Sequence, residues 1–474
     1  MPKRRYYQHR SDNHKLLSLM TAAALLCGGL YYGYRHFVHF NPQDIVVNSV
    51  LKEKTFATKV KEVVSPKQKI KAYLFEDKTN PIISVNFMFK NSGLANDNDT
   101  EVGLANMVAA LLTTGSGELD RIQFQEELEK RAISISFSAS RDEMNGALLT
   151  TKAQAGKAYR LLKNVLAYPR FDEADIEQVK AERLVMLKQQ SEHPDRVLGL
   201  EANEILFGNH PYSRNPLGKA SDIIAISRSQ VAEYVKNHFT RNNLIVGIAG
   251  DISTEEAGKM LDDVFGSLPD SGRTAFVRKA RIDYQGGDRN IDKNLPQSIA
   301  RFVAPGVTRS DKDFYPLYVA NHVLGGSGLT SRLSLAAREK EALTYGVYTY
   351  MSTADKAPML AGSFSATPEN FSRVKKIVKN EWQKMGDRGV SQEELVAAKE
   401  YLLASYNLRF ASITDIAEIL TAMQKEDLGI DFLQKRNDYI RNIKLTEVNT
   451  AAKKFFDNKN LRFITIGNKG AGKE

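Results

Sequence analysis

The chain has 474 residues, of which 42% are hydrophobic and 26% charged, with a formal net charge of +10. This composition is typical of a folded protein with two or three domains and excludes a mostly disordered chain. About half of the net charge lies in residues 1–40, and no basic runs interleaved with aromatic residues follow, which argues against nucleic-acid binding. The single cysteine, Cys27, excludes an intrachain disulfide and a cysteine-based metal cluster.

An uncharged run spans residues 16–34 and reads LLSLMTAAALLCGGLYYGY. A helix of this length nearly crosses the hydrocarbon core of a bilayer. Because basic residues precede the run, it predicts a cytoplasmic amino terminus and an exported bulk. Residues 1–40 are therefore interpreted as a cytoplasmic tail and an uncleaved membrane anchor. The alternative is a cleaved signal peptide, with Ala22 and Ala24 as small residues before the cut.

Residues 41–267 carry hydrophobic patterns that predict a first domain of strands and helices. Alternation at Ile83, Val85, Phe87 and Phe89 is typical of a strand. Further strands are predicted at residues 133–137 and 146–151, and helices around residue 106 and at residues 123–131, 155–167 and 172–190.

The same order returns in residues 291–474, after a linker at residues 268–290 that is rich in turn residues. Strands are predicted at residues 299–303, 344–351 and 359–365, and helices at residues 315–324, 371–385 and 392–409. Two matches reveal the repeat, because residues 171–180 parallel 390–399 and residues 231–250 parallel 448–467. The sequence thus predicts an α+β fold with two tandem homologous domains, each a mainly antiparallel sheet packed with helices.

The helix predicted around residue 106 lies in the run GLANMVAALLTTGS and has a chemically inert face. Asn106, Ala109 and Ala110 have the spacing i, i+3 and i+4, so they share that face. Alanine has no lone pair, and one amide is not a zinc site, because protein zinc sites use Cys, His and carboxylates. The later run from residue 182 ends at Gln189, followed by Gln190, and neither residue offers a carboxylate.

These two runs resemble those of the pitrilysin/insulinase zinc peptidases, also called inverzincins, in their short two-domain bacterial type. In the family pattern G-L-A-H-x-x-E-H, two histidines bind zinc and the glutamate activates water, and a later glutamate completes the site. The resemblance places Asn106 and Ala110 at the histidine positions, Ala109 at the catalytic glutamate and Gln189 at the third ligand. It implies a fold like that of mitochondrial processing peptidase, and a non-catalytic member that binds no zinc or other cofactor itself.

A motif of the second half also resembles the family. Residues 325–333 read GGSGLTSRL, and residues 338–345 read REKEALTY, with Ala342 in place of the usual glycine of L-R-E-x-x-G-L-x-Y. In active members the matching Arg and Tyr hold the peptide, which implies substrate-binding roles for Arg338 and Tyr345. Guanidinium and phenol groups suit peptide oxygens. The alternative is that Arg338 caps a helix end and Tyr345 begins a strand. The glycine run lacks the lysine of a phosphate loop and predicts a flexible or tightly turned backbone.

The leading functional hypothesis is a membrane-anchored, non-catalytic subunit of a two-component zinc endopeptidase. A homologous partner with H-x-x-E-H would hold zinc in this heterodimer, and this chain would help to bind the peptide substrate. One alternative is a peptide-binding or assembly protein without proteolysis. A zinc peptidase active alone is disfavoured, because hydrolysis needs a metal and a base. The anchor and the resemblance predict an inner-membrane protein with a periplasmic bulk, or a soluble periplasmic protein if the anchor is cut.

Overall fold

The computed structural model describes residues 60–273 and 276–468, which belong to one compact unit. The anchor predicted at residues 16–34 lies outside the described residues. Among the helices that are described, none is long and apolar enough to cross a bilayer.

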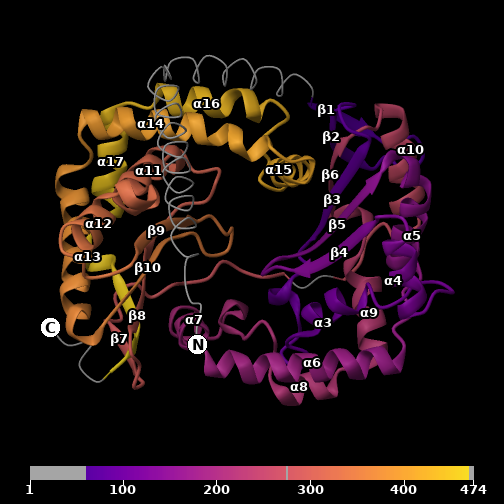
Figure 1. The fold of residues 1–474 in the computed structure, drawn as a ribbon, viewed down its shortest axis with the longest axis horizontal. Helices are drawn as coiled ribbons and strands as arrows, with labels where there is room; N and C mark the ends of the chain where they lie inside the picture. The colour runs from indigo at the N-terminus through magenta and orange to yellow at the C-terminus, as the bar shows by residue number, and fades with distance from the viewer. Residues whose placement is uncertain (1–59, 274–275, 469–474) are drawn as a thin grey trace, which may run out of the picture. The chain divides into compact units, whose positions relative to one another are not determined.

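The first half of the chain forms a six-stranded sheet (Figure 1). Its strands are β1 (Val60–Val64), β2 (Lys71–Glu76), β3 (Ile82–Lys90), β4 (Ser134–Ala139), β5 (Glu143–Thr151) and β6 (Leu244–Gly250). Their order in the sheet is β1-β2-β6-β3-β5-β4. The pair β2 and β6 is parallel, and the other neighbouring pairs of these strands are antiparallel.

The second half forms a five-stranded sheet with the same topology. Its strands are β7 (Arg289–Asp292), β8 (Ser298–Pro305), β9 (Val347–Ser352), β10 (Met359–Ala366) and β11 (Arg462–Gly467). Their order is β7-β11-β8-β10-β9, which repeats β2-β6-β3-β5-β4 strand for strand, including the parallel first pair. The predicted α+β fold with two helix-packed sheets is confirmed.

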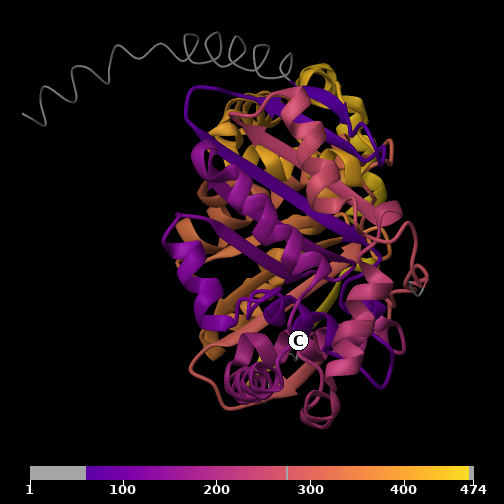
Figure 2. The same ribbon diagram turned by 90° about the vertical axis from the view of Figure 1, so that its right-hand side faces the viewer.

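Helices cover both sheets with amphipathic faces. Those of the first half are α3 (Leu104–Leu111), α4 (Arg121–Glu129), α5 (Ala155–Ala167), α6 (Glu173–Glu192), α7 (Pro194–Phe207), α8 (Ala220–Ala225), α9 (Arg228–His238) and α10 (Thr254–Phe265). Those of the second half are α11 (Phe314–Asn321), α12 (Arg332–Ser334), α13 (Pro368–Arg388), α14 (Gln392–Tyr406), α15 (Ile413–Lys425), α16 (Phe432–Asn442) and α17 (Leu445–Phe455). One core packs the first sheet against helices that include α5 and α10, which stand before the strands in Figure 2. A second core packs the other sheet against helices that include α13 and α17.

Two helices are exchanged between the halves. Helix α7 belongs to the first half by sequence, yet its Leu198 and Ala202 pack in one cluster with Val303 and Ile464 of the second sheet. Helix α15 belongs to the second half, yet it packs on β2, β3 and β6 of the first sheet (Figure 1). Each sheet is therefore completed by a helix from the other half. The predicted division of the chain at residues 268–290 stays a prediction.

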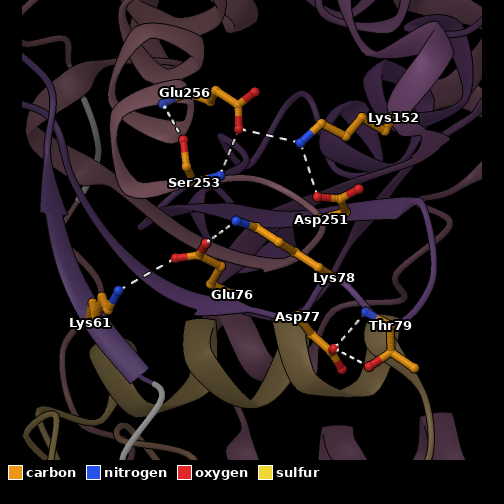
Figure 3. A network of polar contacts seen from close by, with 9 residues as sticks. All are labelled: Lys61, Glu76, Asp77, Lys78, Thr79, Lys152, Asp251, Ser253 and Glu256. Carbon is orange, nitrogen blue, oxygen red and sulfur yellow. Dashed lines mark hydrogen bonds and ion pairs between the residues drawn. The ribbon is translucent and has the colours of Figure 1, made fainter.

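Polar contacts fix the strand ends of the first sheet (Figure 3). Lys152, which follows β5, places its Nζ 2.9 Å from Asp251 Oδ1 and 3.5 Å from Glu256 Oε2. Ser253 caps the N-terminus of α10 in a capping box, because the Ser253 hydroxyl accepts from the Glu256 amide and the Glu256 carboxylate accepts from the Ser253 amide. These contacts hold the turn between β6 and α10 in place.

Candidate functional site

The three vacated positions on α3 take part in packing. Asn106 is half-buried, and its Nδ2 donates to the Pro216 carbonyl oxygen at 3.4 Å. Ala109 is 6% exposed within the first core, and Ala110 packs against the same core. This helix face therefore presents methyl groups and one engaged amide where a zinc peptidase needs imidazoles and a carboxylate.

On α6, Arg183 contacts α3. Its Nη2 donates to the Asn106 carbonyl oxygen at 3.4 Å, and burial lowers the pKa of Arg183. Gln189 is exposed, and Gln190 accepts from Asn215 Nδ2 at 2.8 Å. The guanidinium of Arg183 cannot act as a metal ligand, because it has no electron pair to donate and carries a positive charge. In the described part of the chain, no group of three or more His, Cys, Asp or Glu residues could hold a metal ion.

The N-terminus of α3 is held by a buried carboxylate. Asp97 accepts from the Gly103 amide at 2.9 Å and from the Ala105 amide at 3.0 Å, and its side chain is enclosed in the fold. Burial raises the pKa of Asp97 to about 7, although the two amides act in the opposite direction. Sequence reasoning missed this cap, since Asp97 lies six residues before Gly103 and outside the usual N-cap spacing.

We expect the stability of the fold to fall as pH rises from about 4 to about 7 through Asp97. The pKa of this carboxyl is about 7 in the folded chain and ordinarily 3.8, so between these values the folded chain keeps a proton that the unfolded chain releases. Folding is then favoured at the acidic end, and the free energy of unfolding falls by at most about 1.4 kcal/mol per pH unit. Urea unfolding across this range should show a shallower slope for Asp97→Asn, and Asp99→Asn is the control. An unchanged slope in Asp97→Asn would contradict the assignment.

In the second half, Arg338 and Tyr345 both present their side chains to solvent. Arg338 lies on η7, a π-helical turn at Leu335–Glu339, and its side chain is 41% exposed with Nε 3.5 Å from Glu339 Oε1. Tyr345 is 84% exposed and stands two residues before β9. Neither side chain is committed to the core, and no hydrogen bond joins the two among the described residues. Their substrate-binding roles stay predictions.

The segment between them has the backbone of a glycine turn. Ala342 has φ of 50°, a left-handed conformation that favours glycine, and its amide donates to the Arg338 carbonyl oxygen at 3.0 Å. This explains why the family pattern has glycine there. This turn at residues 338–345, here called the Arg338 turn, connects η7 to β9 and separates Arg338 from Tyr345.

The glycine-rich run before η7 is tightly packed. A Cβ on Gly325 would lie 2.5 Å from Thr349 Oγ1, so a larger residue would push β9 away. Arg332 then pins α12, because its Nε donates to Glu394 at 2.7 Å and its Nη2 donates to the Gly389 carbonyl oxygen at 2.9 Å. These contacts fix the position of the segment that leads into the Arg338 turn.

Two protein-family models match this chain. Residues 72–219 match the model of "Insulinase (Peptidase family M16)", and residues 225–402 match that of "Peptidase M16 inactive domain". Together the two matches cover more than half of the chain. The chain belongs to the insulinase-like peptidase M16 family. The family predicted from the α3 and α6 runs is confirmed.

Other M16 proteins extend the comparison. A non-peptidase homologue, YmxG of Helicobacter pylori, is 28% identical over 82% of this chain and 90% of its own length. The β subunit of the mitochondrial processing peptidase of Neurospora crassa is 24% identical over 70% of this chain and 72% of its own. A crystal structure from Pseudomonas fluorescens, titled as a peptidase M16 inactive domain, has a TM-score of 0.81 and 23% identity, covering 87% of this chain and 99% of that one.

These likenesses agree with the vacated site. The Pseudomonas fluorescens structure shows that both halves have the fold of M16 proteins. The similarity to a non-peptidase homologue fits the residues at positions 106, 109, 110 and 189, which offer no imidazole or carboxylate. The chain is thus an M16 family member whose positions 106, 109, 110 and 189 carry none of the zinc-binding and base side chains of the family pattern.

Proposed function

We propose that this chain is the non-catalytic, peptide-binding subunit of a two-component zinc endopeptidase. One observation carries the proposal: the metal and base positions are all vacated, whereas Arg338 and Tyr345 are kept and stand exposed. A chain that had lost every role in peptide handling would have no reason to keep an exposed Arg and Tyr at this spacing.

The chemistry then divides between two chains. Peptide hydrolysis needs a Lewis acid and a base to activate water, and a homologous subunit with H-x-x-E-H would provide both. The guanidinium of Arg338 and the phenol of Tyr345 would donate hydrogen bonds to carbonyl or carboxylate oxygens of the peptide. The mitochondrial processing peptidase relative is itself named as a subunit, which supports a paired arrangement.

The proposal includes the location of the complex. Residues 16–34 would anchor the chain in the inner membrane of a Gram-negative cell, with the M16 halves in the periplasm. The catalytic partner and its peptide substrate would then be periplasmic as well.

Reconstitution tests the proposal. We expect the chain alone to cleave no peptide, and its complex with an H-x-x-E-H homologue from the same organism to cleave peptides and to hold about one zinc per heterodimer. The matched control is a complex in which the partner's H-x-x-E-H glutamate is replaced by glutamine, which should be inactive. Zinc bound near stoichiometrically to this chain alone, with chelator-sensitive cleavage, would overturn the proposal. Peptide binding by the chain without any association with the homologue would instead favour the assembly function.

A further inference from the structure

A cavity of about 330 Å³ lies where α11, η8 (Asn407–Phe410), α15 and α16 meet. Its lining is unusual because it combines three arginines with five aromatic rings. The arginines are Arg309, Arg409 and Arg436, and the rings are Phe314, Tyr315, Tyr318, Tyr406 and Phe432. None of these residues belongs to the α3 face or to the Arg338 turn.

Arg436 is the most buried of the three cations, at 5% exposed. Its Nη1 donates to the Leu402 carbonyl oxygen at 2.9 Å and to Asn437 Oδ1 at 2.6 Å, and its guanidinium lies 4.0 Å from the centroid of the Tyr406 ring. Its Nε and Nη2 have no hydrogen-bond partner in the described ranges. A buried cation without a counter-ion is costly, so these donors favour an anion in the cavity.

Arg309 is fixed by aromatic rings rather than by carboxylates. Its guanidinium lies 4.1 Å from the ring centroid of Phe314, 5.2 Å from that of Tyr315 and 5.3 Å from that of Phe432. Its Nη2 also donates to the Tyr315 hydroxyl at 3.4 Å. Rings that cover the face of a guanidinium leave the other N–H groups on its edge able to donate. Arg309 forms no ion pair with a carboxylate of residues 60–273 or 276–468.

The charges around the cavity are unbalanced. Arg409 on η8 is exposed and, within the described chain, forms no ion pair. Glu426, which directly follows α15, is the one acidic residue among the described residues that line the cavity, and burial raises its pKa. Three cations therefore face one carboxyl whose surroundings favour its neutral form.

We propose that this cavity binds a small molecule in which a carboxylate or phosphate is joined to an aromatic or apolar body. Arginine pairs with both anions through two parallel hydrogen bonds, and the rings would pack against the apolar body. The volume is that of a small-molecule site. Because α15 packs on the first sheet while α11 and α16 belong to the second half, the ligand would bridge the two halves at the exchanged helix.

Titration calorimetry of the full-length chain tests the proposal with three related probes. N-acetylphenylalanine carries a carboxylate, phenyl phosphate carries a phosphate, and N-acetylphenylalaninamide carries neither. We expect saturable binding of at least one anion, with the amide weaker by about tenfold or more. The anion that binds identifies the natural acid group. Equal binding of the amide, or no saturable binding of either anion up to about 10 mM, would overturn the proposal.

Variants locate the binding. Arg309→Gln and Arg409→Gln should each weaken the anion by about tenfold or more, because each removes a charged donor. Arg441→Gln, on α16 but not among the lining residues, is the matched control and should bind like the unaltered chain. Thermal unfolding of each variant separates lost binding from lost folding. Unaltered affinity in both cavity variants would also overturn the proposal.

Discussion

Replacing Arg338 and Tyr345 together by alanine is expected to lower the peptidase activity of the reconstituted complex by about 100-fold or more. Donors that position a peptide and stabilise its developing charge typically contribute factors of this size. The fold should be unaffected, because the side chains are 41% and 84% exposed, and such substitutions usually change stability by less than about 0.5 kcal/mol. The expected loss is therefore one of function without unfolding.

Initial rates of peptide cleavage, measured beside thermal unfolding, check this result. Arg441→Ala with Tyr168→Ala is the matched control, since these side chains are also exposed, at 38% and 62%, and lie outside the Arg338 turn. The control should retain full activity. Full activity in Arg338→Ala/Tyr345→Ala would contradict the division of labour even if the two chains form a complex.

Local patterns predicted the elements whose partners are near in sequence. Helix α5 spans the predicted residues 155–167, and β3 follows the alternation of Ile83, Val85, Phe87 and Phe89. The strand predicted from residue 344 begins instead at Val347, because the Thr344 hydroxyl donates to the Ser365 carbonyl oxygen and accepts from the Gly346 amide. This side chain forms a local turn that competes with the strand.

The exchanged helices could not be placed from the sequence. Ile416, Leu420 and Met423 give α15 an apolar face, but nothing in that spacing says which sheet it covers. Its contacts lie on β6 and β3, more than 150 residues away along the chain. A periodic pattern predicts that a face is buried, and only the tertiary structure identifies its partner.

The candidate site was likewise only partly predictable from the sequence. Missing zinc donors can be read from residue types alone, so the vacated positions on α3 were accessible to sequence reasoning. The contact of Arg183 with α3 and the cap at Asp97 were not, since both depend on how segments meet in space. The same is true of the arginine cavity, because Arg309 and Arg409 are 100 residues apart and follow no motif.

Replacing Gly247 by alanine is expected to lower the free energy of unfolding by about 2–3 kcal/mol, because the added methyl group overpacks the contact between β6 and α15. A Cβ there would lie 2.3 Å from the Ala417 carbonyl oxygen and 2.8 Å from the Thr421 amide nitrogen. These are backbone atoms, so they cannot turn aside as a flexible side chain could. Helix α15 would have to move as a body.

That movement is opposed by hydrogen bonds that hold α15 to the first sheet. Gln424 Nε2 donates to the Val246 carbonyl oxygen at 2.7 Å, and Thr421 Oγ1 donates to the Asn86 carbonyl oxygen at 3.2 Å. Shifting α15 would stretch these bonds and leave strand carbonyl groups poorly satisfied. The expected cost therefore includes lost hydrogen bonds as well as steric repulsion.

Urea unfolding and amide exchange of α15 measure the effect, and Gly156→Ala is the matched control. Gly156 lies in α5 with nothing within 4 Å of an added Cβ, so the same substitution should stabilise the chain by about 0.5–1 kcal/mol through helix propensity. The same chemical change is thus expected to act with opposite signs at the two sites. If Gly247→Ala were as stable as the unaltered chain and exchanged its α15 amides no faster, α15 would not be seated on β6 in solution, and the exchange of helices between the halves would be wrong.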